Sequence, residues 1–275
     1  QFPNIPKPIS TITKEFNLRI LNHDIEKVDR PQILIAGCGT GQHSITTATK
    51  FKNCDVLAID LSLSSVAYAK RKTEELGISN IEYMQADILD LLSLDRNFDI
   101  IESYGVLHHM DDPMAGWKVL TDCLNTGGLI QIGLYSELAR KHIVQIRDEI
   151  EQSNIESSYD AMKLFRNNIA SSEEEHHKRA VSSFDFYSMS ALRDLLFHVQ
   201  EHRFTIPQIE ASLTQLGLVF CGFENREAVQ NFKLKNSTET ALYDLEKWDT
   251  YEKENPSVFA RMYQFCCQKE GRKTL

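Results

Sequence analysis

The residues with the clearest potential for chemistry form a glycine-rich turn. Gly37, Gly39 and Gly41 follow the apolar run 33–36 and precede a segment with helical spacing that starts at Ser44. Because glycine lacks a Cβ and tolerates positive φ, a ligand can lie against the backbone of such a turn. The unpaired N–H groups at the start of the next helix favour an electron-rich group. We therefore expect the turn to hold a nucleoside-like cofactor.

The spacing of the glycines narrows the choice of cofactor. A dinucleotide fingerprint, G-x-G-x-x-G, needs a third glycine where this chain has Gln42, so a nicotinamide oxidoreductase is disfavoured. A second apolar run, 55–59, ends in Asp60, about 20 residues after Gly37, which is the offset at which a carboxylate meets ribose hydroxyls. The alternative for Asp60 is a helix N-cap or a solvated acid in a turn.

Taken together, the turn and the acid resemble the class I S-adenosylmethionine-dependent methyltransferases. The resemblance implies S-adenosylmethionine as cofactor and S-adenosylhomocysteine as product. It also implies that the three glycines pass close to the methionine part and that Asp60 binds the ribose hydroxyls. The full cofactor-binding set that we predict from it is Ala36, Gly37, Cys38, Gly39, Gly41, His43, Asp60, Leu61, Asp87, Ile88 and Tyr104.

Two further strands supply members of this set. The run 80–88 is predicted as a third strand, and the family implies that its Asp87 and Ile88 hold the adenine; the alternative is an N-cap acid and a core isoleucine. The run 98–105 is predicted as the fourth strand. Ligands of open α/β sheets lie beyond the carboxyl ends of the strands, so Tyr104 and His108 are expected to face cofactor and acceptor.

The segment after the fourth strand bears on the acceptor. Its pattern V-L-H-H-x-x-D-P, residues 106–113, looks like methyltransferases that act on small molecules, although each histidine could equally cap or pack. Enzymes that methylate base amines or glutamine amides carry an Asn/Asp-Pro-Pro-aromatic motif after this strand. Residues 102–105 of this chain are E-S-Y-G instead, so the motif is absent. No Pro-Cys pair supplies the thiol used on C5 of pyrimidines.

The second half of the chain is predicted to carry specificity. Residues 136–153 have helical spacing, with Arg140, Lys141, Arg147 and Asp148 on the expected solvent face. Residues 154–205 exceed a family linker and are predicted as an inserted helical cap. The charged run 171–179 contains two histidines, but it lacks a repeated ligand spacing, so we interpret it as a solvated helix face and predict no metal.

Another candidate segment of the cap is 194–205. His198 and His202 lie four residues apart with Glu201 between them, but the order H-E-x-x-H is absent, so catalytic zinc is disfavoured. This segment, the turn at 35–43 and the run 262–265 are similar to a group of bacterial methyltransferases often joined to tetratricopeptide repeats. No such repeats occur in this sequence, and a repeat module could precede Gln1 in a longer protein.

The predicted architecture is a Rossmann-like α/β fold. The resemblance implies a seven-stranded class I methyltransferase sheet of order 3-2-1-4-5-7-6, with the last two strands near 218–223 and 262–268. We divide the chain into an N-terminal helical extension (1–31), an S-adenosylmethionine-binding half (32–153), the cap (154–205) and a C-terminal part (206–275) with a helical insertion at 225–256. A helix over 11–23 is expected to pack across the domain edge; the alternative is a lid.

Composition excludes several classes. The 275 residues include 42% apolar and 25% charged residues, which is typical of a globular chain. A net charge of −9 disfavours nucleic acid as a partner. No apolar run reaches the length of a membrane span and no secretory signal is present, so we expect a cytoplasmic protein without membrane contact. The six cysteines form no C-x-x-C pair, so neither disulfides nor zinc are predicted.

The predicted function is methyl transfer to a small-molecule acceptor by in-line displacement, for which the protein must position the nucleophile and exclude water. The predicted catalytic residues are His108, His202 and Tyr135, with one histidine as base. Predicted acceptor contacts are His108, Tyr135, Tyr187, His198, Glu201 and His202. The alternatives are a protein or peptide methyltransferase, and a module that binds the cofactor without chemistry.

Overall fold

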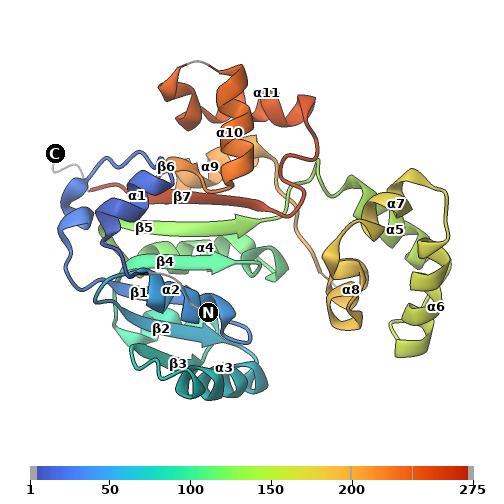
Figure 1. Cartoon of the computed structure of the whole chain (residues 1–275), viewed down its shortest axis with the longest axis horizontal. Coiled ribbons are helices and arrows are strands. Elements are labelled where there is room, and N and C mark those ends of the chain that lie inside the picture. The colour runs from blue at the N-terminus through green and yellow to red at the C-terminus, as the bar shows by residue number, and fades with distance from the viewer. Residues whose placement is uncertain (1–4, 199, 237, 272–275) are drawn as a thin grey trace.

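The computed structural model describes residues 5–198, 200–236 and 238–271 and contains one seven-stranded sheet (Figure 1). Its strand order, β3-β2-β1-β4-β5-β7-β6, confirms the predicted fold class. The strands are β1 (Gln32–Ala36), β2 (Asp55–Asp60), β3 (Ile81–Gln85), β4 (Phe98–Tyr104), β5 (Leu124–Leu134), β6 (Leu218–Phe223) and β7 (Tyr263–Lys269). The first five run parallel, and β7 is antiparallel to both β5 and β6.

Helices cover both faces of the sheet, which is why the central strands read as continuous apolar runs. Alternate residues of β1 separate the two layers: Ile33 and Ile35 pack in one hydrophobic cluster and Leu34 in the other. The first cluster includes residues of α1 (Ile9–Glu15), α2 (Gln42–Lys50) and α3 (Leu63–Glu75). The second includes residues of η2 (Ile88–Leu94), α4 (Pro113–Asp122), α9 (Ile206–Leu216), α10 (Arg226–Lys235), η5 (Glu239–Tyr243) and α11 (Leu245–Glu254).

A separate group of helices forms the cap. It stands at the end of the sheet toward which the arrows of β4 and β5 point (Figure 1). Its members are α5 (Lys141–Gln152), α6 (Tyr159–Ala170), α7 (Glu175–Val181), η4 (Phe184–Phe186) and α8 (Met189–Leu196), and they share one hydrophobic cluster of their own. The packed cap therefore begins at Lys141, whereas the sequence placed its start at residue 154. Within the described ranges, no helix has the length and apolar character needed to cross a bilayer.

Three local expectations from the sequence are corrected. The N-terminal helix covers Ile9–Glu15 rather than 11–23, because Asn17 adopts a left-handed φ of 53°, and a separate 3-10 turn, η1 (His23–Lys27), follows. The Asn-Thr-Gly-Gly segment at 125–128 predicts a turn before a strand that starts at residue 129, but strand β5 begins at Leu124 and includes that segment. Arg140, expected on a solvent face, is buried with 4% of its surface exposed.

Candidate active site

A cavity of about 520 Å³ lies where the carboxyl ends of β1, β2, β3 and β4 meet. Ligand crevices of open α/β sheets occupy this position. Five of the residues predicted to bind the cofactor line it: Gly37, Asp60, Leu61, Asp87 and Ile88. The other lining residues are Ile59, Ala86, Leu89, Gly105, Val106, His109, Met110, Asp111, Asp112 and Ala115.

The glycine-rich turn is fastened to the neighbouring strand. The N–H groups of Gly37 and Cys38 both donate to the carbonyl oxygen of Ile59, at 2.9 and 2.8 Å. The N–H of Gly39 donates to Asp60 Oδ2 at 2.8 Å. A Cβ on Gly37, whose φ is 87°, would lie 2.1 Å from a methyl carbon of Val106. The turn therefore has no room for a side chain at position 37.

Two acids end strands at the rim of the cavity. Asp60 ends β2, and its Oδ1 accepts the N–H of Ser62 at 2.9 Å. Asp87 follows β3, and its Oδ1 accepts the N–H of Leu89 at 2.9 Å as the N-cap of η2. The capping geometry that the sequence offered as an alternative is therefore present at Asp87, and the same residue lines the cavity.

His43 lies beneath the turn rather than at the cavity. Its Nε2 is 2.7 Å from Glu102 Oε2, and the Thr47 hydroxyl donates to the same oxygen at 2.6 Å. Burial alone would raise the pKa of Glu102, but the hydrogen bond and charge of His43 outweigh it and lower that pKa to about 2. Burial opposes protonation of His43, yet the Glu102 partner raises the pKa of the imidazole. The two groups therefore form an ion pair.

We expect His43→Ala to destabilise the protein by about 2 kcal/mol, because the carboxylate of Glu102 stays buried without its main partner. The contribution of Glu102 is complete above its ordinary pKa of 4.5 and is lost as pH falls toward about 2. The contribution of His43 is complete below 6.5 and is lost as pH rises through its raised pKa. Urea denaturation of both proteins should therefore give the largest difference between pH 4.5 and 6.5.

The matched control is His23→Ala, which removes an exposed histidine 2.6 Å from Glu26 and should change the free energy of unfolding by less than about 1 kcal/mol. An equal effect of the two substitutions at pH 6 would contradict the account.

Tyr104 belongs to a polar group beside that pair. Its ring lies edge-on to His43 with centroids 5.0 Å apart, and its hydroxyl is 2.9 Å from Gln131 Oε1 and 2.7 Å from Glu224 Oε2. Burial raises the pKa of Glu224. Tyr104 is not among the residues that line the cavity, so the geometry gives it a supporting position under the turn.

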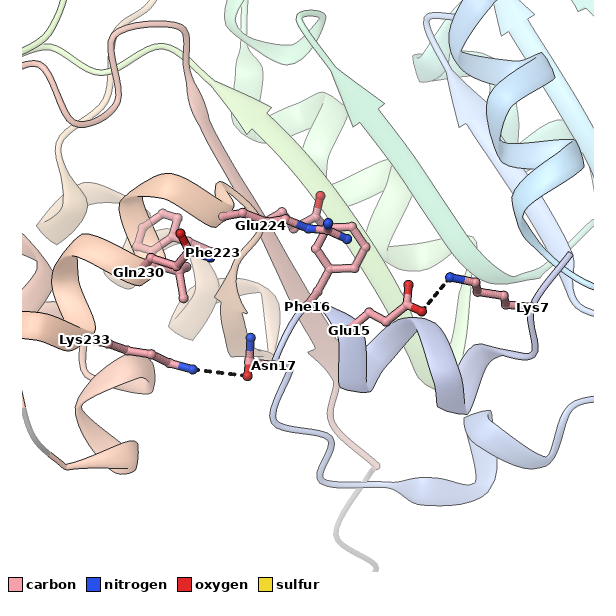
Figure 2. Close-up of a pocket in the computed structure, with 10 residues that line it drawn as sticks. Lys7, Glu15, Phe16, Asn17, Phe223, Glu224, Gln230 and Lys233 are labelled. Carbon is pink, nitrogen blue, oxygen red and sulfur yellow. Dashed lines mark hydrogen bonds and ion pairs between the residues drawn. The ribbon is translucent and has the colours of Figure 1, made fainter. Parts of the chain in front are cut away.

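Glu224 also borders a second cavity, of about 480 Å³, between α1 and α10 (Figure 2). Figure 2 shows two polar side chains of this cavity engaged with neighbours: Lys7 with Glu15 at 2.5 Å and Lys233 with Asn17 at 3.2 Å. None of the predicted site residues lines it. We therefore place the candidate active site at the carboxyl edge of the sheet.

The two adjacent histidines after β4 have different environments. His108 has no exposed surface, and neither ring nitrogen has a hydrogen-bond partner within the described part of the chain. Its ring stacks on Tyr135 with centroids 3.8 Å apart. Burial, with the nearby His109 and Arg140, lowers the pKa of His108 to about 2, which makes the ring a weak base. The structure thus places His108 in the core, not at the cavity where the sequence expected it.

His109 is the histidine that lines the cavity. Its Nδ1 lies 3.0 Å from the carbonyl oxygen of Gln200. A carbonyl oxygen only accepts, so Nδ1 carries the proton and Nε2 is the basic nitrogen. Burial lowers the pKa of His109, and the hydrogen bond to Gln200 partly offsets this. The imidazole is therefore neutral at pH 7 and able to take up a proton.

The segment 200–205 joins the cap to the sheet by backbone hydrogen bonds. The N–H of His202 donates to the carbonyl of His108, and the N–H of Phe204 donates to that of Tyr135, both at 2.8 Å. The rings of His198 and His109 contact each other at an interplanar angle of 30°, with centroids 4.0 Å apart. His202 Nε2 is 3.3 Å from the side-chain nitrogen of Gln200. The structure therefore gathers four predicted residues, His108, Tyr135, His198 and His202, around His109.

The side chain of Glu201 is fully buried and is bound by arginines. Arg140 donates to both of its carboxylate oxygens, at 2.9 and 2.7 Å, and Arg147 donates to Oε2 at 2.9 Å. Arg140 also lies over the ring of Tyr135 at 3.8 Å. Since its oxygens are occupied, the geometry gives Glu201 a role in fastening the cap rather than in binding an acceptor.

Other predicted site residues lie apart from the cavity. Tyr187, in the cap, has 65% of its surface exposed. Ala36 is buried at the end of β1, and burial raises the pKa of the Cys38 thiol to about 12. Sequence reasoning missed Glu102, although an acid within a buried apolar strand was a usable signal.

Comparisons with known proteins agree with this geometry. Residues 33–128 match a methyltransferase domain family. An uncharacterized protein of Synechococcus sp. is 30% identical over 82% of this chain and 57% of its own length. A probable (S)-tetrahydroprotoberberine N-methyltransferase of Papaver bracteatum is 29% identical over 44% of this chain and 34% of its own. PKMT2 from Rickettsia typhi in complex with AdoHcy has a TM-score of 0.67 at 18% identity, over 98% of this chain and 53% of that chain. The chain therefore spans no more than 57% of these relatives.

Proposed function

Because this chain belongs to the class I S-adenosylmethionine-dependent methyltransferases, we propose that it transfers the methyl group to a small-molecule nucleophile bound beside His109. The observation that carries the proposal is the cavity at the carboxyl edge of the sheet. It is lined by Gly37 of the turn, by Asp60 and Asp87, and by the neutral His109. The Papaver bracteatum relative, which is similar over 44% of this chain, is named as a probable (S)-tetrahydroprotoberberine N-methyltransferase.

The residues of the cavity fit the cofactor. The volume of about 520 Å³ is within the range of ligand pockets. A Cβ at Gly37 would meet Val106, so this position needs glycine for the turn to lie against the segment that follows β4. We propose that Asp60 binds the ribose hydroxyls and that Asp87 and Ile88 hold the adenine. When bound, S-adenosylmethionine supplies a methyl group activated by its sulfonium.

On the acceptor side, we propose that His109 takes up the proton of the nucleophile at Nε2. The carbonyl of Gln200 fixes the tautomer, and the neighbouring ring of His198, 4.0 Å away between centroids, limits rotation of the imidazole. His108 and Tyr135 support His109 from the core. This proposal moves the base role from His108 or His202, the histidines to which the sequence analysis gave it, to His109.

We expect His109→Gln to lower methyl transfer about 100-fold or more, because glutamine retains an N–H donor but cannot accept the proton. The measurement is incorporation of labelled methyl from S-adenosylmethionine into the small-molecule fraction of a cell extract. For the wild type, turnover should fall as pH drops below 6.5, since the lowered pKa keeps His109 neutral above that value.

Unchanged affinity for S-adenosylmethionine and an unchanged melting temperature would show that His109→Gln leaves the fold intact. Turnover within about threefold of the wild type would exclude His109 as the base.

A second candidate is transfer to a peptide or protein. A groove of about 500 Å³ on the cap is lined by residues of α5 and by Phe197 and His198. The ring of His198 also contacts His109, which lines the first cavity. An extended acceptor could therefore reach from cap to cofactor. Label on polypeptides, and not on small molecules, would favour this candidate; cofactor binding without label on either would favour a non-catalytic module.

A further inference from the structure

A histidine-rich cluster outside the candidate active site holds together two helices of the cap. Glu149 lies on α5, and His176 and His177 lie at the start of α7. His176 Nε2 is 2.5 Å from Glu149 Oε1, and His177 Nε2 is 2.8 Å from Glu149 Oε2. In the described residues, it is the single group of three such side chains with ligand atoms within 4.8 Å of one another.

We propose that Glu149, His176 and His177 form a binding site for a divalent transition-metal ion, with Zn²⁺ as the best match. Two imidazole nitrogens and one carboxylate are ligands that zinc commonly takes from proteins, with a solvent molecule completing four-coordination. The three side chains already converge, with their ligand atoms within 4.8 Å of one another. In a four-coordinate site with ligand distances near 2.0–2.2 Å, neighbouring donor atoms are about 3.3 Å apart, so the side chains need only small movements to bind an ion.

Burial and a supporting hydrogen bond distinguish this cluster from a surface ion pair. The side chains of His176 and His177 are only 19% and 12% exposed. His177 Nδ1 lies 2.7 Å from the hydroxyl oxygen of Ser172. Metal-bound histidines almost always donate their second N–H to an oxygen acceptor, most often a carboxylate, a backbone carbonyl or water, and this fixes the ring orientation. The Ser172 hydroxyl oxygen can accept in the same way. In the metal-bound form, Nδ1 donates to Ser172 and Nε2 binds the ion.

The position of the cluster suggests what the ion would do. Glu149 lies on the same helix as Arg147, whose guanidinium binds Glu201 at the junction of cap and sheet. A metal that links α5 and α7 would stabilise the cap without entering the candidate active site. From the sequence, the run with these histidines is interpreted as a solvated helix face because it lacks a repeated ligand spacing. The third ligand, Glu149, lies 27 residues before His176, in another helix.

The test is calorimetric titration of the whole chain with ZnCl₂. We expect one equivalent to bind with a micromolar dissociation constant. His177→Ala and Glu149→Gln should each weaken binding at least about 100-fold, and Ser172→Ala about tenfold. His23→Ala, which removes a histidine beside Glu26 on the surface, should leave binding unchanged.

Glu149→Gln and Ser172→Ala keep the size of their side chains or nearly so, and a far-ultraviolet circular dichroism spectrum like that of the wild type shows that they fold. Substituting Co²⁺ should give the intense visible absorption of a four-coordinate site in the wild type and in His23→Ala, but not in His177→Ala or Glu149→Gln. Absence of stoichiometric binding at 100 µM ZnCl₂ would overturn the proposal. So would zinc binding that His177→Ala, Glu149→Gln and Ser172→Ala all retain. Neither result bears on methyl transfer.

Discussion

Replacing Gly37 by alanine is expected to weaken binding of S-adenosylmethionine about 100-fold, corresponding to about 3 kcal/mol. The added Cβ would lie 2.1 Å from Val106, and the φ of 87° is unfavourable for alanine. The turn must therefore move, and its hydrogen bonds to Ile59 and Asp60 move with it. Isothermal titration calorimetry of the variant and the wild type measures the loss directly.

Gly77→Ala is the matched control for this substitution. Gly77 also has a left-handed φ, of 69°, but a Cβ there would meet nothing within 4 Å, and the residue does not line the cavity. We expect a loss of stability of about 1 kcal/mol and unchanged cofactor affinity. Equal affinities for Gly37→Ala and the wild type would mean that the turn does not contact the cofactor.

Removing the carboxylate of Glu201 should be the most destabilising single change in the cap. Glu201→Gln leaves Arg140 and Arg147, with 5% and 17% of their side chains exposed, without a charged partner. Breaking a buried ion pair in this way costs about 3–5 kcal/mol. Urea denaturation and hydrogen exchange over 141–205 should show a weakened cap, and methyl transfer should fall because His202 and His198 lose their positions.

The control for that variant lies in the same cap. Glu173 pairs with Lys178 at 2.6 Å but is 92% exposed, so Glu173→Gln should change stability by less than about 1 kcal/mol. If Glu201→Gln changed stability as little as Glu173→Gln and left hydrogen exchange over 141–205 unchanged, the arginines would not fasten the cap.

The sheet and the cofactor cavity could be predicted because their signals are local in sequence. Apolar runs that alternate with helical spacing identify parallel strands, and the carboxyl ends of parallel strands meet at one edge. Gly37, Asp60 and Asp87 each follow or end such a run, so their convergence on one cavity follows from the fold. The helical spacing after Asp60 likewise predicts a helix over 64–76 that stops before Gly77, and the bounds of α3 agree with it within one residue.

The acceptor side could not be predicted in the same way. Helical periodicity places Arg140 on a solvent-exposed face, because the sequence gives no sign of a buried partner. That partner, Glu201, lies 61 residues later and contacts Arg140 only in the folded chain. His108 and His109 are adjacent in a 3-10 turn, and no spacing indicates which ring enters the core. The Tyr104 hydroxyl likewise donates a hydrogen bond to Glu224, which lies 120 residues later in the sequence. The predicted link to a tetratricopeptide-repeat module stays a prediction.

The most direct test of the central claim is calorimetric titration with S-adenosylmethionine and, separately, with NAD, repeated on Asp60→Ala. We expect micromolar binding of S-adenosylmethionine alone, weakened about 10- to 100-fold by the loss of the charged hydrogen-bond acceptor at the cavity. Absence of S-adenosylmethionine binding, or equal binding of NAD, would contradict the assignment of the glycine-rich turn and, with it, the proposed methyl transfer.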